Sequence, residues 1–153
     1  MTPAGHAKLV ADFKYTREVL RPQVVRDIEE ARAHGDISEN SEYEDAKDRQ
    51  GQIEARVRDM ELNLALAEVI DVATLPPSDL VIFGTTVDLE DLDSGDTSTY
   101  RLVGADETDV KNGMISYSSP IGRALIGRKV GDEVRFETPK GTRAVVINAV
   151  HYR

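Results

Sequence analysis

Two carboxylates, Asp36 and Glu39, are the residues in this sequence whose types and spacing most favour chemistry. They lie within residues 35–43, between two long segments with helical periodicity, so we expect them on the connection of a helical hairpin. Carboxylate oxygens are suitable ligands for Mg²⁺, but two of them on an open connection would bind the ion weakly. The chemistry indicated is completion of a site on another molecule that already holds metal and phosphate. The alternative is that both acids are solvated surface charges.

The elements that must position these acids are two amphipathic helices. Apolar positions in residues 2–32 recur at steps of mostly three and four, with Thr16 filling one gap: Leu9, Phe13, Leu20, Val24, Ile28 and Ala31. Pro22 predicts a kink in this helix rather than a stop. Residues 41–69 carry a heptad seam at Ala46, Gln50, Ile53, Val57, Met60, Leu64 and Ala67. The pattern predicts an antiparallel coiled-coil hairpin over residues 1–74.

After a proline-containing linker at residues 75–79, the apolar period changes to two. Five strands are predicted, over residues 81–89, 97–103, 115–117, 133–138 and 143–152. A short helix is expected to begin at Ser119-Pro120 and to end at Gly127. The predicted fold class is therefore α+β, with the hairpin followed by a small α+β domain over residues 80–153.

The composition excludes several classes of protein. The 153 residues carry 19 basic and 28 acidic side chains, a net charge of -9. Residues 1–74 hold 10 basic and 16 acidic side chains and residues 75–153 hold 9 and 12, so binding to duplex nucleic acid through a broad basic surface is disfavoured. The absence of cysteine removes disulfides and thiolate sites. With no long apolar run, we expect a cytoplasmic protein that does not use a membrane.

The connection also carries a resemblance to a known family. Its sequence is similar to the G-D-L-S-E-N-A-E-Y signature of the GreA/GreB family of bacterial transcript-cleavage factors, and reads Gly35-Asp36-Ile37-Ser38-Glu39-Asn40-Ser41-Glu42-Tyr43. The likeness continues in one order along nearly the whole chain, at residues 21–22, 31–32, 52–56, 67–71, 81–84, 100–104 and 118–127. The resemblance implies that the second domain is an FKBP-like sheet.

The resemblance further implies a function and a set of site residues. Such factors enter the secondary channel of bacterial RNA polymerase and stimulate hydrolysis of backtracked RNA by helping to hold a second Mg²⁺. By resemblance, Asp36 and Glu39 hold that ion together with the polymerase. The other implied residues are Ser38, Asn40 and Tyr43 in support, Arg32 and Lys47 on the RNA 3′ end, and Ser119, Pro120, Ile121, Gly122 and Arg123 in docking on the polymerase rim. A monomeric accessory factor, not an enzyme by itself, is expected.

Alternatives remain open for several of these residues. Asn40 and Tyr43 could make a local turn contact, Arg32 and Lys47 could be an exposed pair, and Ile121 could pack in the core. Glu44 and Asp45 add negative charge beside Lys47, which favours removal of short RNA fragments and leaves open a Gre-like inhibitor that occupies the same channel. A second alternative is a coiled-coil chaperone or adaptor. Prolyl isomerisation is not expected, because the aromatic residues are scattered.

Overall fold

The computed structural model describes residues 1–33 and 41–153, which divide into two compact units. The helical unit is Ala4–Ala67, and the globular unit consists of Met1–Pro3 together with Glu68–Arg153. The division therefore comes earlier than the predicted boundary at residue 74, because the second long helix ends at Leu66. Within the described ranges, no helix has the length and apolar character needed to cross a membrane.

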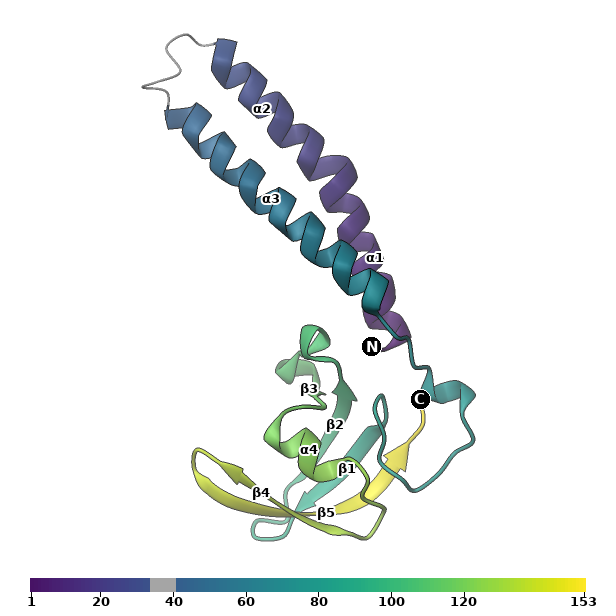
Figure 1. Ribbon diagram of the computed structural model, residues 1–153. Coiled ribbons are helices and arrows are strands. Elements are labelled where there is room, and N and C mark those ends of the chain that lie inside the picture. The colour runs from purple at the N-terminus through teal and green to yellow at the C-terminus, as the bar shows by residue number, and fades with distance from the viewer. Residues whose placement is uncertain (34–40) are drawn as a thin grey trace. The chain divides into compact units, whose positions relative to one another are not determined.

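The helical unit is a hairpin of two long arms. The first arm contains α1 (Pro3–Tyr15), a π-helical turn (Thr16–Leu20) and α2 (Arg21–Ala33), and the second is α3 (Ser41–Leu66). Helices α2 and α3 run side by side in opposite directions (Figure 1). Glu42 and Glu44 lie in the first turn of α3, where negative charge is favourable beside the helix N-terminus.

The predicted apolar seam is confirmed in both arms. Its buried members are Thr16, Val24, Ile28 and Ala31 on the first arm and Ala46, Val57 and Met60 on the second, while Gln50, Ile53 and Leu64 are half-buried. These positions recur every three or four residues, so they form one stripe on each helix. Each stripe is narrow enough to be covered by the facing arm alone.

The helix disturbance predicted at Pro22 takes the form of a π-helical turn directly before it. The Arg21 N–H donates to the Thr16 carbonyl, five residues earlier. Thr16 is 1% exposed, and its hydroxyl donates to the Asp12 carbonyl at 2.8 Å. Proline cannot supply the N–H that an α-helix needs, and a π turn is one way of accommodating an extra residue without ending the helix. The helix therefore continues to Ala33.

The globular unit contains a five-stranded sheet in the order β3-β2-β1-β5-β4 (Figure 1). Its strands are β1 (Thr86–Asp91), β2 (Thr97–Val103), β3 (Met114–Ser116), β4 (Glu133–Thr138) and β5 (Gly141–His151). Neighbouring strands are antiparallel except β2 and β3, which are parallel. Short 3₁₀ turns occupy Val72–Thr74, Ala105–Glu107 and Val110–Asn112. The predicted α+β fold class is confirmed.

The core of this unit gathers on one face of the sheet. Its buried members include Val87 and Leu89 from β1, Leu102 from β2, Ile147 from β5 and Leu125 from the short helix α4 (Pro120–Leu125). Helix α4 therefore closes the apolar face, and the alternate residues of the strands face outward.

The first strand starts later than predicted. Val81 is fully buried, but β1 begins at Thr86, because Gly84 adopts a left-handed conformation with φ of +87°. Before this turn the Val81 N–H donates to the Arg128 carbonyl, outside the sheet. Alternation of apolar residues thus predicted the burial of Val81 but not the break in the strand.

Thr2 is held inside the globular unit by Glu107. The Thr2 N–H donates to Glu107 Oε1 at 2.9 Å, and the Thr2 hydroxyl donates to the same oxygen. The second oxygen, Oε2, accepts from the Gly104 N–H at 2.8 Å. Since Thr2 is only 1% exposed, one carboxylate satisfies the polar groups of a buried residue far away in sequence.

Two carboxyl groups on β1 have lowered pKa values. Hydrogen bonds from His151 and then Thr99 lower the pKa of Asp88. Backbone N–H groups of the following turn, at Ser94 and Asp93, lower the pKa of Asp91, with a smaller effect of Arg143. Both residues stabilise the sheet and its turn, and neither belongs to a candidate site.

Candidate functional site

The end of the helical hairpin is defined by Ala33 and Ser41, where α2 ends and α3 begins. Asp36, Ser38, Glu39 and Asn40 fall between these residues and lie outside the described part of the chain. The described residues at the two helix ends therefore provide the geometry of the site.

Two small residues are buried near this end of the hairpin, one on each helix. Ala31 on α2 is 3% exposed and Ala46 on α3 is 1% exposed. A side chain of one carbon allows neighbouring helix backbones to approach, since interaxial distance depends on the residues at the contact.

On one side of this seam, three of the residues predicted from the sequence gather. The Arg32 guanidinium carbon lies 5.8 Å from the centroid of the Tyr43 ring, within the range of a cation–π contact. Lys47 is exposed one helical turn beyond Tyr43 and therefore on the same side of α3. The contact brings Arg32 and Tyr43 together across the two helices, and Lys47 lies on the same side of α3.

The other side of the seam is acidic. A depression of about 330 Å³ is lined by Asp27, Glu30, Ala31, Glu42, Asp45 and Arg49. Arg49 Nη1 lies 3.2 Å from Asp27 Oδ2, which links α3 to α2. In the described ranges, no group of three or more His, Cys, Asp or Glu residues could hold a metal ion. The depression is thus an acidic surface.

The five residues predicted for docking separate into structural and exposed ones. Ser119 caps α4 by accepting from the Gly122 N–H at 3.1 Å, and Gly122 is buried. Ile121 is half-buried and packs against the core of the globular unit. Pro120 and Arg123 are exposed. We therefore expect a charge introduced at Ile121 to affect folding as well as any docking contact, and the fully exposed side chains of this segment are those of Pro120 and Arg123.

Two family models match most of this chain. A family model described as "Transcription elongation factor, N-terminal" matches residues 1–69, and one described as "Transcription elongation factor, GreA/GreB, C-term" matches residues 76–152. The chain belongs to the GreA/GreB family.

Full-length relatives support this membership of the GreA/GreB family. "Transcription elongation factor GreA" of Psychrobacter sp. (strain PRwf-1) is 50% identical over 153 residues, covering 100% of this chain and 97% of the relative. The protein of that name from Methylococcus capsulatus is 47% identical over 152 residues, covering 99% and 96%. Among solved structures, GreA factor homolog 1 (Gfh1) of Thermus thermophilus is 31% identical, covering 99% and 97%, with a TM-score of 0.45.

Gly122 is a structural requirement of this GreA/GreB family chain that the sequence pattern did not reveal. A Cβ atom at this position would lie 2.3 Å from the Ser116 carbonyl oxygen and 2.8 Å from that of Tyr117. Both atoms belong to the backbone, so neither can rotate away. We expect Gly122→Ala to lower the free energy of unfolding by about 1–3 kcal/mol through overpacking.

Chemical denaturation of the Gly122→Ala variant measures this effect. Gly51→Ala is the matched control, because a Cβ atom at Gly51 meets nothing within 4 Å and Gly51 lies inside a helix. An exposed helical Gly→Ala change stabilises by up to about 1 kcal/mol. Equal unfolding midpoints for Gly122→Ala and the unchanged protein would assign Gly122 to docking alone.

Sequence reasoning also missed the ion pairs that join the arms. Arg49 contacts Asp27, and the Arg21 guanidinium contacts the Glu54 carboxylate. Opposite charges that flank the seams of the two helices indicate that interhelical ion pairs could form. Which residues pair depends on the register of one helix against the other. That alignment depends on the tertiary structure.

Proposed function

We propose that this chain is an accessory factor of bacterial RNA polymerase that stimulates hydrolysis of a backtracked transcript. The proposal extends the family assignment, which covers transcription elongation, to a partner and a mechanism. The observation that carries it is a two-helix arm whose apolar seam is covered internally, and whose connection contains Asp36 and Glu39. Such an arm can enter a channel of another protein without exposing a core.

Asp36 and Glu39 are the proposed metal-holding groups. Their carboxylate oxygens fit Mg²⁺, but two ligands leave most of its coordination positions to other molecules. We propose that polymerase and RNA supply the rest, with Ser38 and Asn40 supporting the connection. When bound, the ion would activate water and offset charge on the phosphodiester. The chain's own contribution is to deliver the two carboxylates, so it is not an enzyme by itself.

Arg32, Tyr43 and Lys47 are the proposed contacts to the RNA 3′ end. The Arg32–Tyr43 stack supports this role, since an aromatic face can stack on a base and the two cations can approach phosphates. Asp45 and Glu44 stand next to these residues in sequence and limit the attraction to a short length of RNA. We therefore propose removal of short fragments.

Docking on the rim of the polymerase is assigned to the exposed residues of the 119–123 segment. Pro120 and Arg123 are accessible, while Ser119, Ile121 and Gly122 hold α4 in place. An exposed arginine beside a rigid proline is suited to contact an acidic surface of a protein partner.

The deciding experiment adds the purified protein to a stalled, backtracked elongation complex with radiolabelled RNA. Shortened RNA that still extends on addition of nucleotides is the expected result. Complexes without the protein provide the control for the polymerase's intrinsic cleavage, which sets the baseline.

Each other outcome identifies an alternative. Polymerase binding with reduced intrinsic cleavage would make the chain an inhibitor that occupies the channel. Failure to bind core polymerase would reject the proposed partner and favour a chaperone or adaptor role.

A further inference from the structure

One contact between the two arms is an ion pair that also includes a directional hydrogen bond. Arg21 Nε on the first arm lies 2.9 Å from Glu54 Oε1 on α3, and Arg21 Nη2 donates to Glu54 Oε2 at 3.0 Å. The two side chains are 35% and 37% exposed. Arg21 is therefore more shielded from water than Arg49, which is 54% exposed, while the two acids, Glu54 at 37% and Asp27 at 32%, are similar. Less exposure means weaker screening of the charges.

The Arg21 Nε atom makes it energetically unfavourable for one helix to slide along the other. It is buried, and no hydrogen bond of good geometry reaches it within the described structure. Its charge is offset by the Glu54 carboxylate at ion-pair distance. If α2 moved along α3 by one turn, about 5.4 Å, that carboxylate would leave and a buried guanidinium nitrogen would remain.

The apolar seam by itself specifies this alignment weakly. Near the connection it contains the small residues Ala31 and Ala46, whose side chains offer little shape to distinguish one register from another. Apolar burial has no direction, so a shift that exchanges one small residue for another changes the buried area little. A directed contact is needed to choose one register.

The π-helical turn determines where Arg21 stands on its helix. The Arg21 N–H closes this turn on the Thr16 carbonyl, and Thr16 is anchored by burial and by its bond to Asp12. The extra residue of a π turn rotates the next helical segment relative to an uninterrupted α-helix. It thus determines which face of the first arm presents Arg21 to Glu54.

We propose that Arg21 and Glu54 are a positioning pair that locks the register of the first arm against α3. The register decides where Ala33 and Ser41 stand relative to each other, and thereby the span that residues 34–40 must bridge. Through this span the pair controls whether Asp36 and Glu39 are delivered together. The role in cleavage rests on the proposed function, whereas the register itself does not.

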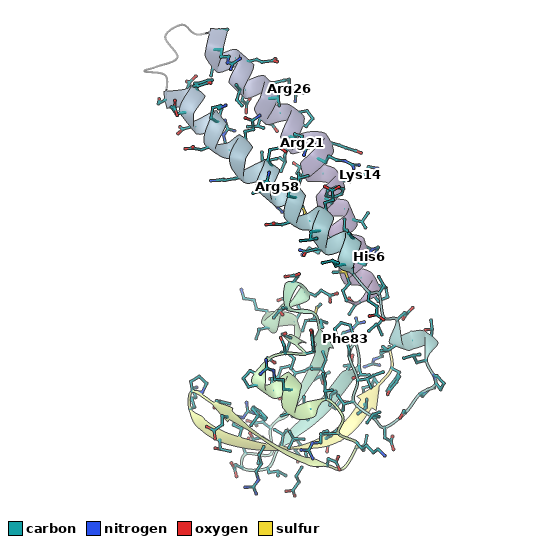
Figure 2. All side chains as sticks on the ribbon, viewed as in Figure 1. His6, Lys14, Arg21, Arg26, Arg58 and Phe83 are labelled. Atoms are coloured by element: carbon teal, nitrogen blue, oxygen red, sulfur yellow. The ribbon has the colours of Figure 1, made fainter. Side chains whose placement is uncertain are left out.

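The test compares Arg21→Gln, Glu54→Gln and the exchanged pair Arg21→Glu/Glu54→Arg. Arg26→Gln is the matched control, because Arg26 lies on the same helix, is exposed, and loses the same charge (Figure 2). Maximal cleavage rate and half-saturating protein concentration are measured separately on a backtracked complex. Each single variant should lower the maximal rate by about tenfold, since small misplacement of reacting groups is costly.

The half-saturating concentration should stay within about twofold, because the pair positions the connection and does not dock the protein. The exchanged pair should recover most of the rate, and Arg26→Gln should retain it. A destabilised hairpin would instead raise the half-saturating concentration and would not be restored by exchange. That result would overturn the positioning role.

A second readout does not involve polymerase. The sequence has no cysteine, so spin labels on Lys14→Cys and Asp48→Cys attach at two exposed sites only, one on each arm. Double electron–electron resonance should give a single narrow distance distribution for the unchanged pair and for the exchanged pair. The single variants should add a population displaced by about 5 Å, one helical turn.

The two readouts separate the possible failures. If the unchanged protein does not stimulate cleavage, the proposed function fails, while the spin-label distances still decide the register. Identical distance distributions in Arg21→Gln and the unchanged protein would show that the Arg21–Glu54 pair does not fix the register.

Discussion

Replacement of both Asp36 and Glu39 by alanine should abolish stimulated cleavage of a backtracked transcript. The proposed site depends on two carboxylates to hold one Mg²⁺ beside the polymerase, and alanine offers no ligand. Stability and polymerase binding should change little, because neither the seam nor the 119–123 segment contains these residues. RNA shortening, thermal unfolding and core polymerase binding are measured on the same preparations.

The single Glu39→Ala variant extends this prediction. One carboxylate still recruits the ion by mass action, so raising Mg²⁺ should recover part of the activity. Asp48→Ala is the matched control, because it removes an exposed acid from α3 without touching the proposed metal ligands. Full cleavage by the double variant at ordinary Mg²⁺ would show that the arm acts without these acids, and steric occupation of the channel would then replace metal delivery.

Val57→Asp should unfold the helical hairpin. Val57 is 4% exposed in the seam of α3, so the new carboxylate would lose its hydration without an assigned cation partner. Burial of an unpaired charge in a seam costs about 3–5 kcal/mol, a large share of the stability of a small domain. Circular dichroism should show loss of helix, and stimulated cleavage should fail with it.

Leu62→Asp controls for the substitution itself. It places the same charge on the same helix, but Leu62 is 57% exposed, so the charge stays hydrated and the helix should persist. Unchanged helicity and thermal midpoint in Val57→Asp would mean that the assigned seam does not hold the arms together.

Features with a local cause could be predicted from the sequence. The spacing of apolar residues at three and four positions predicted that Val57 and Ala46 are buried in the seam. This prediction needs no tertiary information, because the faces of a helix recur at a fixed period. The start of α4 followed from residue types that favour a helix N-terminus, since Ser119 caps α4 and Pro120 is its first residue. Both predictions required only neighbours within a few positions.

Features with a distant cause were missed. The need for glycine at position 122 comes from carbonyl groups of Ser116 and Tyr117, which approach only after α4 folds onto the sheet. Pro22 indicated a disturbed helix, but the sequence did not show that a π-helical turn at residues 16–20 absorbs the disturbance. The candidate site divides in the same way. Tyr43 and Lys47 could be aligned by helix period, whereas the Arg32 contact joins two helices.

The sheet order has a consequence for synthesis of this chain. Strand β5, residues 141–151, is the last of the five strands to be synthesised, yet it lies between β1 and β4. Until it leaves the ribosome, β1 keeps an unpaired edge and β4 has no neighbour in the sheet, so both carry open backbone groups that can pair with other chains. The helical unit lies within residues 4–67 and can form much earlier. A ribosome that stops short of residue 141 would thus release a finished arm attached to an aggregation-prone half-sheet.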